Sequence, residues 1–171
     1  MSALRFIKKV EVTSAVSTVN VTDVFSSDFE LYKIIWDDWV ATGTAGWVDI
    51  RLINSSGSVV SSSNYCGAHM DMNSAGVGDF KDANDNKFDR GLVYNQGSTG
   101  GCQEMWVMNP YESDRYTFIT ATTRNYAGSG DSGDYKLLCF KQLSTITGIQ
   151  AVQLSGYPMT GSVKVYGMSK V

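Results

Sequence analysis

The sequence predicts an all-β protein, a single antiparallel β-sandwich domain over residues 1–171. Three observations support this prediction. Apolar and polar residues alternate with a two-residue period in most apolar segments, as in strands with one buried face. Few windows of eleven or more residues have helical periodicity without an intervening glycine or Ser/Thr cluster. Runs such as "YKIIW" at 32–36 and "KLLCFK" at 136–141 are apolar on both faces, which predicts strands between two layers.

Length and composition indicate one soluble domain. The chain has 171 residues, of which 43% are apolar and 12% aromatic, enough to build a buried core. Its net charge is −3, and no run of Lys or Arg could neutralise several neighbouring phosphates, so nucleic acid is not an expected partner. No apolar stretch follows the basic N-terminus or approaches the length of a membrane span, so we expect neither a secretion signal nor membrane insertion.

The clearest strand is "WVDIRLI" at 47–53, where Val48, Ile50 and Leu52 share one face. β-Branched and aromatic residues are enriched in similar runs along the rest of the chain. These runs predict eight further strands, at residues 6–12, 16–22, 29–37, 103–108, 115–122, 135–141, 148–154 and 162–166.

The last two predicted strands, 148–154 and 162–166, are expected to pair as a hairpin across "SGYPMTG". Val163 and Val165 would then face the core, and the chain would end once its last strand had closed the sheet. We therefore expect deletion of residues 161–171 to abolish folding.

Two segments are predicted to be loops because they are dense in Asp, Asn and Gly. Residues 64–91 are expected to form a long excursion with one short strand near 87–92, and residues 125–134 an exposed hairpin loop. Loops on a rigid sandwich often bind partners. The candidate ligand- or partner-contact residues of these loops are Tyr65, His69, Asp79, Asp82, Asp85, Tyr126 and Asp131.

No motif in the sequence indicates a catalytic or metal centre. His69 is the single histidine, which argues against multi-His zinc sites, and no G-x-S-x-G motif accompanies it. An irregular calcium site is conceivable, although turn formation explains its candidate ligands as well. We expect no cofactor and no enzyme; the remaining enzyme alternative is a polysaccharide depolymerase using acids such as Asp79, Asp85 or Glu104. The candidate calcium ligands are Asp71, Asp79, Asp82 and Asp85.

Cysteine and aromatic residues are also expected to be structural. Cys66, Cys102 and Cys139 form no C-x-x-C pair and fit buried, inert, reduced thiols. Core packing is the commoner fate of large aromatics, although those in loops could stack on sugar rings. The aromatics considered for this role are Trp36, Trp39, Trp47, Tyr65, Tyr94, Tyr111 and Tyr126.

The final segment, "ITGIQAVQLSGYPMTGSVKVYGMSK", resembles the end of a β-sandwich domain found in tailed-phage structural and tail proteins. There, a strand "I-x-G-I-x-h" leads through a glycine-bearing turn into "G-S/T-h-x-h-Y-G", where h is apolar. The segments "KKVEVTSAVSTVNVTDVFSSDFELYKIIWDD" and "GWVDIRLINSSGSVVSSSNY" resemble the opening and a central part of the same proteins.

This resemblance implies a jelly-roll-like sandwich that is a structural component of a bacteriophage virion, as a capsid-decoration or tail protein. Such a subunit would be seated on the capsid, neck or tail beside other virion proteins, after assembly in the cytoplasm of the bacterial host. A homo-oligomer is expected, with a homotrimer as one option, because subunit contacts cover exposed edge strands. The alternative is a tail-fibre or tail-tip module whose loops bind a receptor or a host-surface glycan.

Overall fold

Over the residues that the structure describes, the protein is a sandwich of two antiparallel β-sheets with eight and three strands. The computed structural model describes residues 3–41, 47–73, 76–92, 100–127, 130–153 and 157–169, with the backbone alone at 125–127 and 130–131. Within these ranges no residue is helical, which confirms the all-β prediction. Over the same residues there is accordingly no helix that could span a lipid bilayer.

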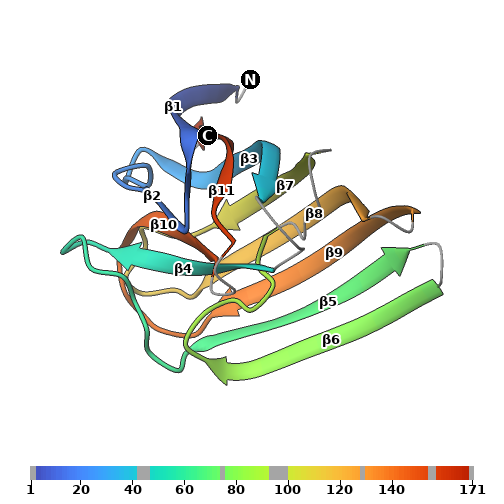
Figure 1. Cartoon of the computed structure of the whole chain (residues 1–171). Helices are drawn as coiled ribbons and strands as arrows, with labels where there is room; N and C mark the ends of the chain where they lie inside the picture. Colours follow the sequence, from blue (N-terminus) through green and yellow to red (C-terminus); the bar gives the residue numbers. More distant parts are fainter. Residues whose placement is uncertain are drawn as a thin grey trace.

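The large sheet has the strand order β1-β11-β3-β7-β8-β9-β5-β6 (Figure 1). Its first and last strands along the chain, β1 and β11, are neighbours at one side, and the β5–β6 hairpin lies at the other. The bounds are β1 Leu4–Val16, β3 Phe29–Ala41, β5 Tyr65–Asn73, β6 Gly76–Asp85, β7 Gly101–Met108, β8 Thr117–Ala127, β9 Gly130–Phe140 and β11 Met159–Ser169.

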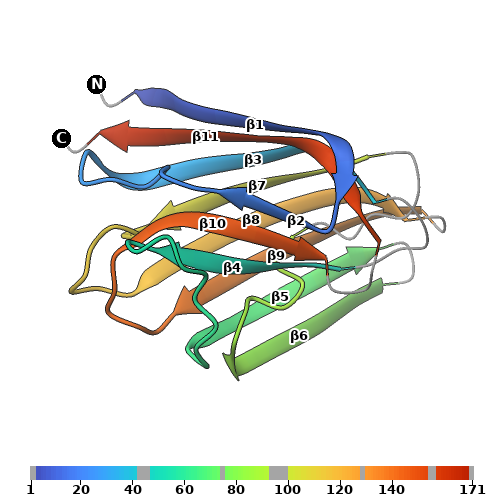
Figure 2. The same cartoon turned by 60° about the vertical axis from the view of Figure 1, so that its left-hand side comes forward.

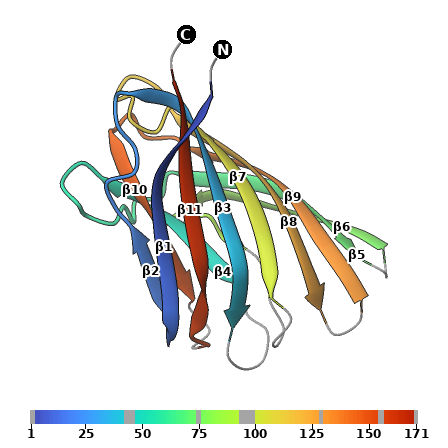
Figure 3. The ribbon, with the colours of Figure 1, turned by 90° about the horizontal axis from the view of Figure 1, so that it is seen from above.

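The small sheet has the order β2-β10-β4, with bounds Thr18–Val21, Ile146–Gln153 and Val48–Asn54. It lies against one part of the large sheet (Figure 2). Seen from above, β5 and β6 extend away from the three covering strands (Figure 3). The small sheet therefore covers only part of the inner face of the large sheet.

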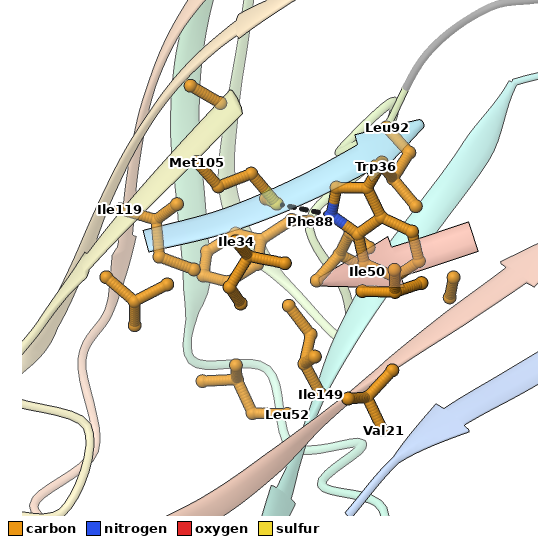
Figure 4. Close-up of a cluster of buried hydrophobic side chains, with 14 of the residues drawn as sticks. Val21, Ile34, Trp36, Ile50, Leu52, Phe88, Leu92, Met105, Ile119 and Ile149 are labelled. Carbon is orange, nitrogen blue, oxygen red and sulfur yellow. Dashed lines mark hydrogen bonds between the residues drawn. The ribbon is translucent and has the colours of Figure 1, made fainter. Parts of the chain in front are cut away.

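The core fills the space between the two sheets. Alternation along β3 directs Tyr32, Ile34 and Trp36 inward, and all three are fully buried. The Trp36 indole Nε1 donates to Met105 Sδ at 3.0 Å (Figure 4). Facing them from the small sheet are Val21, Ile50, Leu52 and Ile149.

The predicted hairpin between the last two strands is wrong. β10 pairs with β2 and β4 in the small sheet, whereas β11 pairs with β1 and β3 in the large sheet. Each strand thus already has two other neighbours, and the connection carries the chain from one layer to the other. The second part of the prediction is confirmed, because Val163 and Val165 are completely buried.

The predicted excursion at 64–91 is also wrong, because most of it forms the β5–β6 hairpin. β5 is paired on both sides, with β9 and β6, so its backbone hydrogen bonds are made within the sheet. The apolar residues Met70 and Met72 point outward, whereas His69 and Asp71 point inward. This inverted pattern explains why the alternation did not resemble a strand with an apolar buried face.

Three smaller expectations also change. The predicted loop at 125–134 is mostly strand, since β8 runs to Ala127 and β9 begins at Gly130. The predicted strand at 16–22 is divided at Ser17, where the chain leaves β1 in the large sheet and enters β2 in the small one. The short strand expected near 87–92 is reduced to one β-bridge, between Phe88 and Ile50 of β4.

Candidate functional site

The inner face of the large sheet changes from apolar to polar along β9 and β5. Along β9 the inward residues are Phe140, Leu138, Lys136 and Asp134, all of them buried. β5 is antiparallel to β9 and pairs with it without a register shift, so the inward residues of β5 show the same change from apolar to polar. The cross-strand pairs are Tyr65 with Phe140, Gly67 with Leu138, His69 with Lys136, and Asp71 with Asp134.

The polar character continues across β8 and β7. Thr123 pairs with Asp134, and Gln103 pairs with Thr123, so four strands contribute one transverse row. We call Gln103, Thr123, Asp134 and Asp71 the polar row. Gln103 and Thr123 are only 2% and 3% exposed. Polar side chains so deeply buried require hydrogen-bonding partners.

Residues 87–92, which we call the strap, connect this region to the small sheet. Main-chain hydrogen bonds join Phe88 to Ile50 in both directions, and Leu92 N donates to Val48 O at 2.9 Å. On the large sheet, Lys136 Nζ donates to the Arg90 carbonyl at 2.6 Å, and Gln103 Nε2 donates to the Gly91 carbonyl at 3.0 Å. Two polar side chains of the inner face therefore hold the strap.

The side chain of Arg90 is packed between two aromatic rings. Its guanidinium carbon lies 4.7 Å from the Trp47 ring centroid and 4.5 Å from that of Phe80. His69 stacks on Phe80, with ring centroids 4.8 Å apart. Cation–π contacts of this kind stabilise a guanidinium that has left bulk water.

Burial dominates the electrostatics of this region. Lys136 is completely buried, and its Nζ lies 3.0 Å from Asp134 Oδ2. Burial lowers the pKa of Lys136, and the charge of Asp134 opposes that shift. Burial, followed by a hydrogen bond with Asp134, raises the pKa of Asp71 to about 6. Burial also lowers the pKa of His69, so this imidazole favours its neutral form.

A second carboxylate group surrounds Lys87 at the start of the strap. Lys87 Nζ lies 2.9 Å from Asp89 Oδ1 and 3.6 Å from Asp49 Oδ2. Asp49 Oδ1 also accepts a hydrogen bond from Arg90 N at 2.9 Å. Burial raises the pKa of Asp49 to about 6, and the neighbouring carboxyl of Asp89 adds to the shift.

Four buried polar atoms of this region lack hydrogen-bond partners within the part of the chain that the structure describes. They are His69 Nε2, Asp71 Oδ1, Gln103 Oε1 and Thr123 Oγ1. His69 Nε2 and Asp71 Oδ1 lie 3.5 Å apart, which is long for a hydrogen bond. These atoms include both acceptors and groups that can donate or accept, so hydroxyl groups or water molecules suit them.

The residues predicted from the sequence to contact ligands do not form one loop surface. Tyr65 belongs to the core, and its hydroxyl donates to the Val60 carbonyl at 2.8 Å. His69 and Asp82 line one narrow pocket together with Phe80, Lys87 and Asp89, with room for about one water molecule. Asp79 points outward from β6, and Asp85 lies at the end of that strand. Tyr126 and Asp131 are paired between β8 and β9, and their side chains lie outside the described residues.

The candidate calcium ligands are separated by the pleat of the hairpin. Met70, not Asp71, is the residue opposite Asp79, so Asp71 and Asp79 point to opposite faces of the sheet. In the described ranges no group of three or more His, Cys, Asp or Glu side chains is arranged to hold a metal ion.

The aromatic residues mostly follow the core expectation. Trp36, Trp39 and Tyr65 are fully buried. Trp47 is half-buried and packs against Arg90, and Tyr111 is half-buried. Tyr94 lies outside the described residues.

The outer face of the large sheet has two chemically different halves. On β3, β7 and β11 the outward charges are paired, with Lys33–Glu104 at 2.8 Å and Lys164–Asp37 at 2.7 Å. On β8, β9 and β5, large apolar side chains are exposed instead, and we call this half the apolar outer patch. Leu137 is 51% exposed, and the other most exposed members are each 43% exposed, namely Phe118, Tyr135, Met70 and Met72.

A hollow of about 540 Å³, open to solvent, lies within this patch. Phe118, Leu137 and Met108 contribute to its lining, together with Cys66 and Cys139. The alternation along β5 could have indicated this apolar surface if the face that carries Met70 and Met72 had been taken as the outer face.

The expectation of buried thiols is wrong. Cys102 is exposed, and Cys66 and Cys139 are half-buried on the outer face, although all three are free thiols. Cys66 and Cys139 are directly opposite each other on β5 and β9, and Cys66 Sγ lies 3.4 Å from the Cys139 carbonyl oxygen. Burial raises the pKa of Cys139 to about 11, and Cys66 adds to the shift.

Comparisons with known proteins show no family membership. No family model matches the chain, and no curated protein matches it. A human SPRY domain is a weak structural neighbour, with a TM-score of 0.37 and 9% identity over 94% of this chain and 97% of that one. The CBM2 module of an evolved Dit from Lactobacillus casei BL23 phage J-1 has a TM-score of 0.27 and 8% identity over 90% and 69%. Scytalido-glutamic peptidase has a TM-score of 0.24 and 15% identity over 94% and 66%. Likenesses this weak carry no argument about function.

Proposed function

We propose that the chain is a structural subunit of a bacteriophage virion that contacts neighbouring virion proteins through the apolar outer patch. The observation that carries this proposal is the exposure of Phe118, Leu137 and Met70 on adjacent strands of an uncovered sheet face. Monomeric proteins rarely expose contiguous apolar surface of this kind, and such patches usually mark interaction sites.

The contrast within the outer face supports the same proposal. The half formed by β3, β7 and β11 carries ion pairs suited to contact with water, such as Lys33–Glu104. The half formed by β8, β9 and β5 contains the hollow between Phe118 and Leu137, into which a side chain of a neighbouring protein would fit. A structural subunit needs such a contact surface but does not need catalytic residues, so we assign no catalytic residues to this chain.

The assignment to a virion rests on the sequence resemblance to tailed-phage structural proteins. The motif glycines that carry it have packing roles in this chain. A Cβ on Gly167 would lie 2.4 Å from the Phe29 ring, and a Cβ on Gly161 would lie 2.4 Å from Trp39 Cε3. Both positions are tight contacts of a sandwich, as expected of motifs that specify a fold.

The experiment is the assembly of phage particles with substituted subunits. Leu137→Asp should abolish incorporation of the subunit into particles, or make particles less stable, because it places a charge in the contact surface. Lys164→Asp, on the ion-paired half, is the control and should be incorporated normally. Particles that form normally and keep normal stability without the subunit would refute the structural role.

A second candidate function is recognition of a host-surface glycan, favoured by an open pocket of about 640 Å³ at one end of β5, β8 and β9. Thr122, Arg124 and Tyr135 contribute polar groups and an aromatic ring to its lining, although the loop residues first expected to bind a glycan lie mostly on strands. Purified protein should then compete with phage for adsorption and give signals on a glycan array. Absence of both signals would remove this candidate.

A further inference from the structure

Strand β6 forms a free edge of the large sheet. It is the last strand in the sheet order, and the views in Figures 1 and 2 show no element beside its outer edge. Its pairing with β5 runs without a register shift from Cys66–Ala83 to Asn73–Gly76. Among the described residues, no strand pairs with its other side. A long, regular edge of this kind offers main-chain donors and acceptors to another strand.

The hydrogen-bond pattern determines which β6 residues face this edge. Lys141 N donates to Asn64 O at 2.8 Å, so the carbonyl group of Asn64 points towards the strand segment of Lys141. The main-chain N–H and C=O groups of successive residues point to opposite sides of a strand. The odd-numbered residues of β5 therefore direct these groups to β6. Because His69 pairs with Phe80, the even-numbered residues of β6 are bonded to β5.

The main-chain groups at the free edge therefore belong to Val77, Asp79, Lys81 and Ala83. The side chains of these four residues are exposed. Val77 is 70% exposed, the largest exposure among the large apolar side chains described. Asp79 and Lys81 have opposite charges, and neither has an ion-pair partner in the described part of the chain.

The charges select one register for pairing with a second copy. An antiparallel pair of identical strands has a two-fold axis. Residues whose main-chain groups point to the free edge must lie opposite residues of the second copy whose groups also point to its free edge. An axis at Asp79 would place two aspartates opposite each other, and an axis at Lys81 would place two lysines opposite each other. An axis at Phe80 places Asp79 of each copy opposite Lys81 of the other, and Val77 opposite Ala83.

We propose that two copies of the chain associate through their β6 strands in this register, with Phe80 facing Phe80 at the two-fold axis. The large sheets would then continue across the dimer, and cross-strand pairs of opposite charge would fix the register. The inference concerns the isolated chain, so it is independent of whether the chain is part of a virion.

The other edge of the large sheet is less suited to such pairing. β1 has register shifts between Phe6 and Lys8 and between Val12 and Val16. Such irregularities bend a strand and interrupt its row of hydrogen-bonding groups. The difference between the two edges favours a closed dimer over an open chain of subunits.

Sedimentation velocity of the purified chain over a range of concentrations tests the proposal. An edge-strand contact is small, so we expect a weak dimer with a dissociation constant in the micromolar range. Asp79→Lys and Lys81→Asp should each abolish dimerisation because they place like charges opposite each other. Lys9→Asp, on the β1 edge, is the control and should leave the dimer unchanged. Unchanged circular dichroism and thermal unfolding would show that each variant is folded.

Two rescue measurements test the register. An equimolar mixture of the Asp79→Lys and Lys81→Asp chains should form dimers, because each strand then faces opposite charges. The double variant Asp79→Lys/Lys81→Asp should dimerise with itself for the same reason. A monomeric native chain, native-like dimers of either single variant, or failure of both rescues would overturn the proposal.

Discussion

The ammonium group of Lys136 lies 3.0 Å from Asp134 Oδ2 and also donates a hydrogen bond to the Arg90 carbonyl oxygen. The pair joins the inner face of β9 to the strap. Lys136→Met should destabilise the protein by about 3–5 kcal/mol, because it leaves a buried carboxylate without its partner. Urea denaturation monitored by tryptophan fluorescence would measure this loss.

The double variant Lys136→Met/Asp134→Leu is the matched control for that prediction. Removing both charges should recover much of the lost stability, since an apolar pair can replace a buried ion pair. A double variant as unstable as the single one would show that Asp134 is not the cause of the loss.

The raised pKa of Asp71, about 6, predicts an unusual pH dependence. A carboxyl whose folded-state pKa exceeds its unfolded-state value destabilises the folded protein when it is ionised. Its contribution to stability should therefore increase as the pH falls from about 7 towards the unfolded pKa of about 4. His69 acts in the opposite direction, because burial lowers its pKa and protonation costs stability below its usual pKa.

Comparing Asp71→Asn with the native chain isolates the aspartate from the histidine. The asparagine variant should be more stable than the native protein at pH 8, and the difference should shrink between pH 6 and pH 4. Thermal unfolding across this range is the measurement. A variant that is less stable than the native protein at pH 8 would contradict the assignment.

Gly167 of β11 should not tolerate a side chain. The Cβ of alanine would lie 2.4 Å from the Phe29 ring, so Gly167→Ala should destabilise the fold by roughly 1–3 kcal/mol through overpacking. Gly78→Ala on β6 is the control, because an added Cβ there meets nothing within 4 Å. Equal melting temperatures for the two variants would contradict the packing role of Gly167.

Cys66 and Cys139 should form a disulfide when treated with a small-molecule disulfide such as oxidised glutathione. The two thiols face each other across neighbouring strands, and residues paired in this way have Cα separations within the range that a disulfide spans. Each bond formed would release two molecules of reduced glutathione. Intact-mass analysis should show the loss of two hydrogen atoms in the native chain and in Cys102→Ser, but not in Cys66→Ser.

Deletion of residues 161–171 should abolish folding. These residues form most of β11, which pairs with β1 on one side and β3 on the other. Val163 and Val165 would also be lost from the core. A truncated chain that stays soluble and keeps the native melting temperature would refute this expectation.

The sequence was most informative where burial and alternation coincide. Ile50, Leu52 and Val163 follow the simple rule that apolar residues on alternate positions face the core, and all three are buried as predicted. The rule failed for β5, where His69 and Asp71 face inward and Met70 and Met72 face outward. Sequence period alone cannot show which face of a strand is covered, since that depends on where the second sheet ends.

The candidate site was harder to predict because its residues meet only through strand pairing. Gln103, Thr123, Asp134 and Asp71 come from four strands, and no spacing along the chain relates them. His69 was singled out because it is the only histidine, yet its neighbours Lys136 and Phe80 could not be identified without the register. The hairpin predicted at the C-terminal end failed for a similar reason, because nearby strands can belong to different layers.

The position of β11 between β1 and β3 also has a consequence for biosynthesis. The ribosome synthesises β1 and β3 long before residues 159–169. Until those residues are made, β1 and β3 lack the strand that pairs with both of them. During translation the nascent chain would expose unpaired strand edges, a situation that invites aggregation and recruits chaperones. Final closure of the large sheet is therefore expected to be a late step, because it must follow the synthesis of residues 159–169.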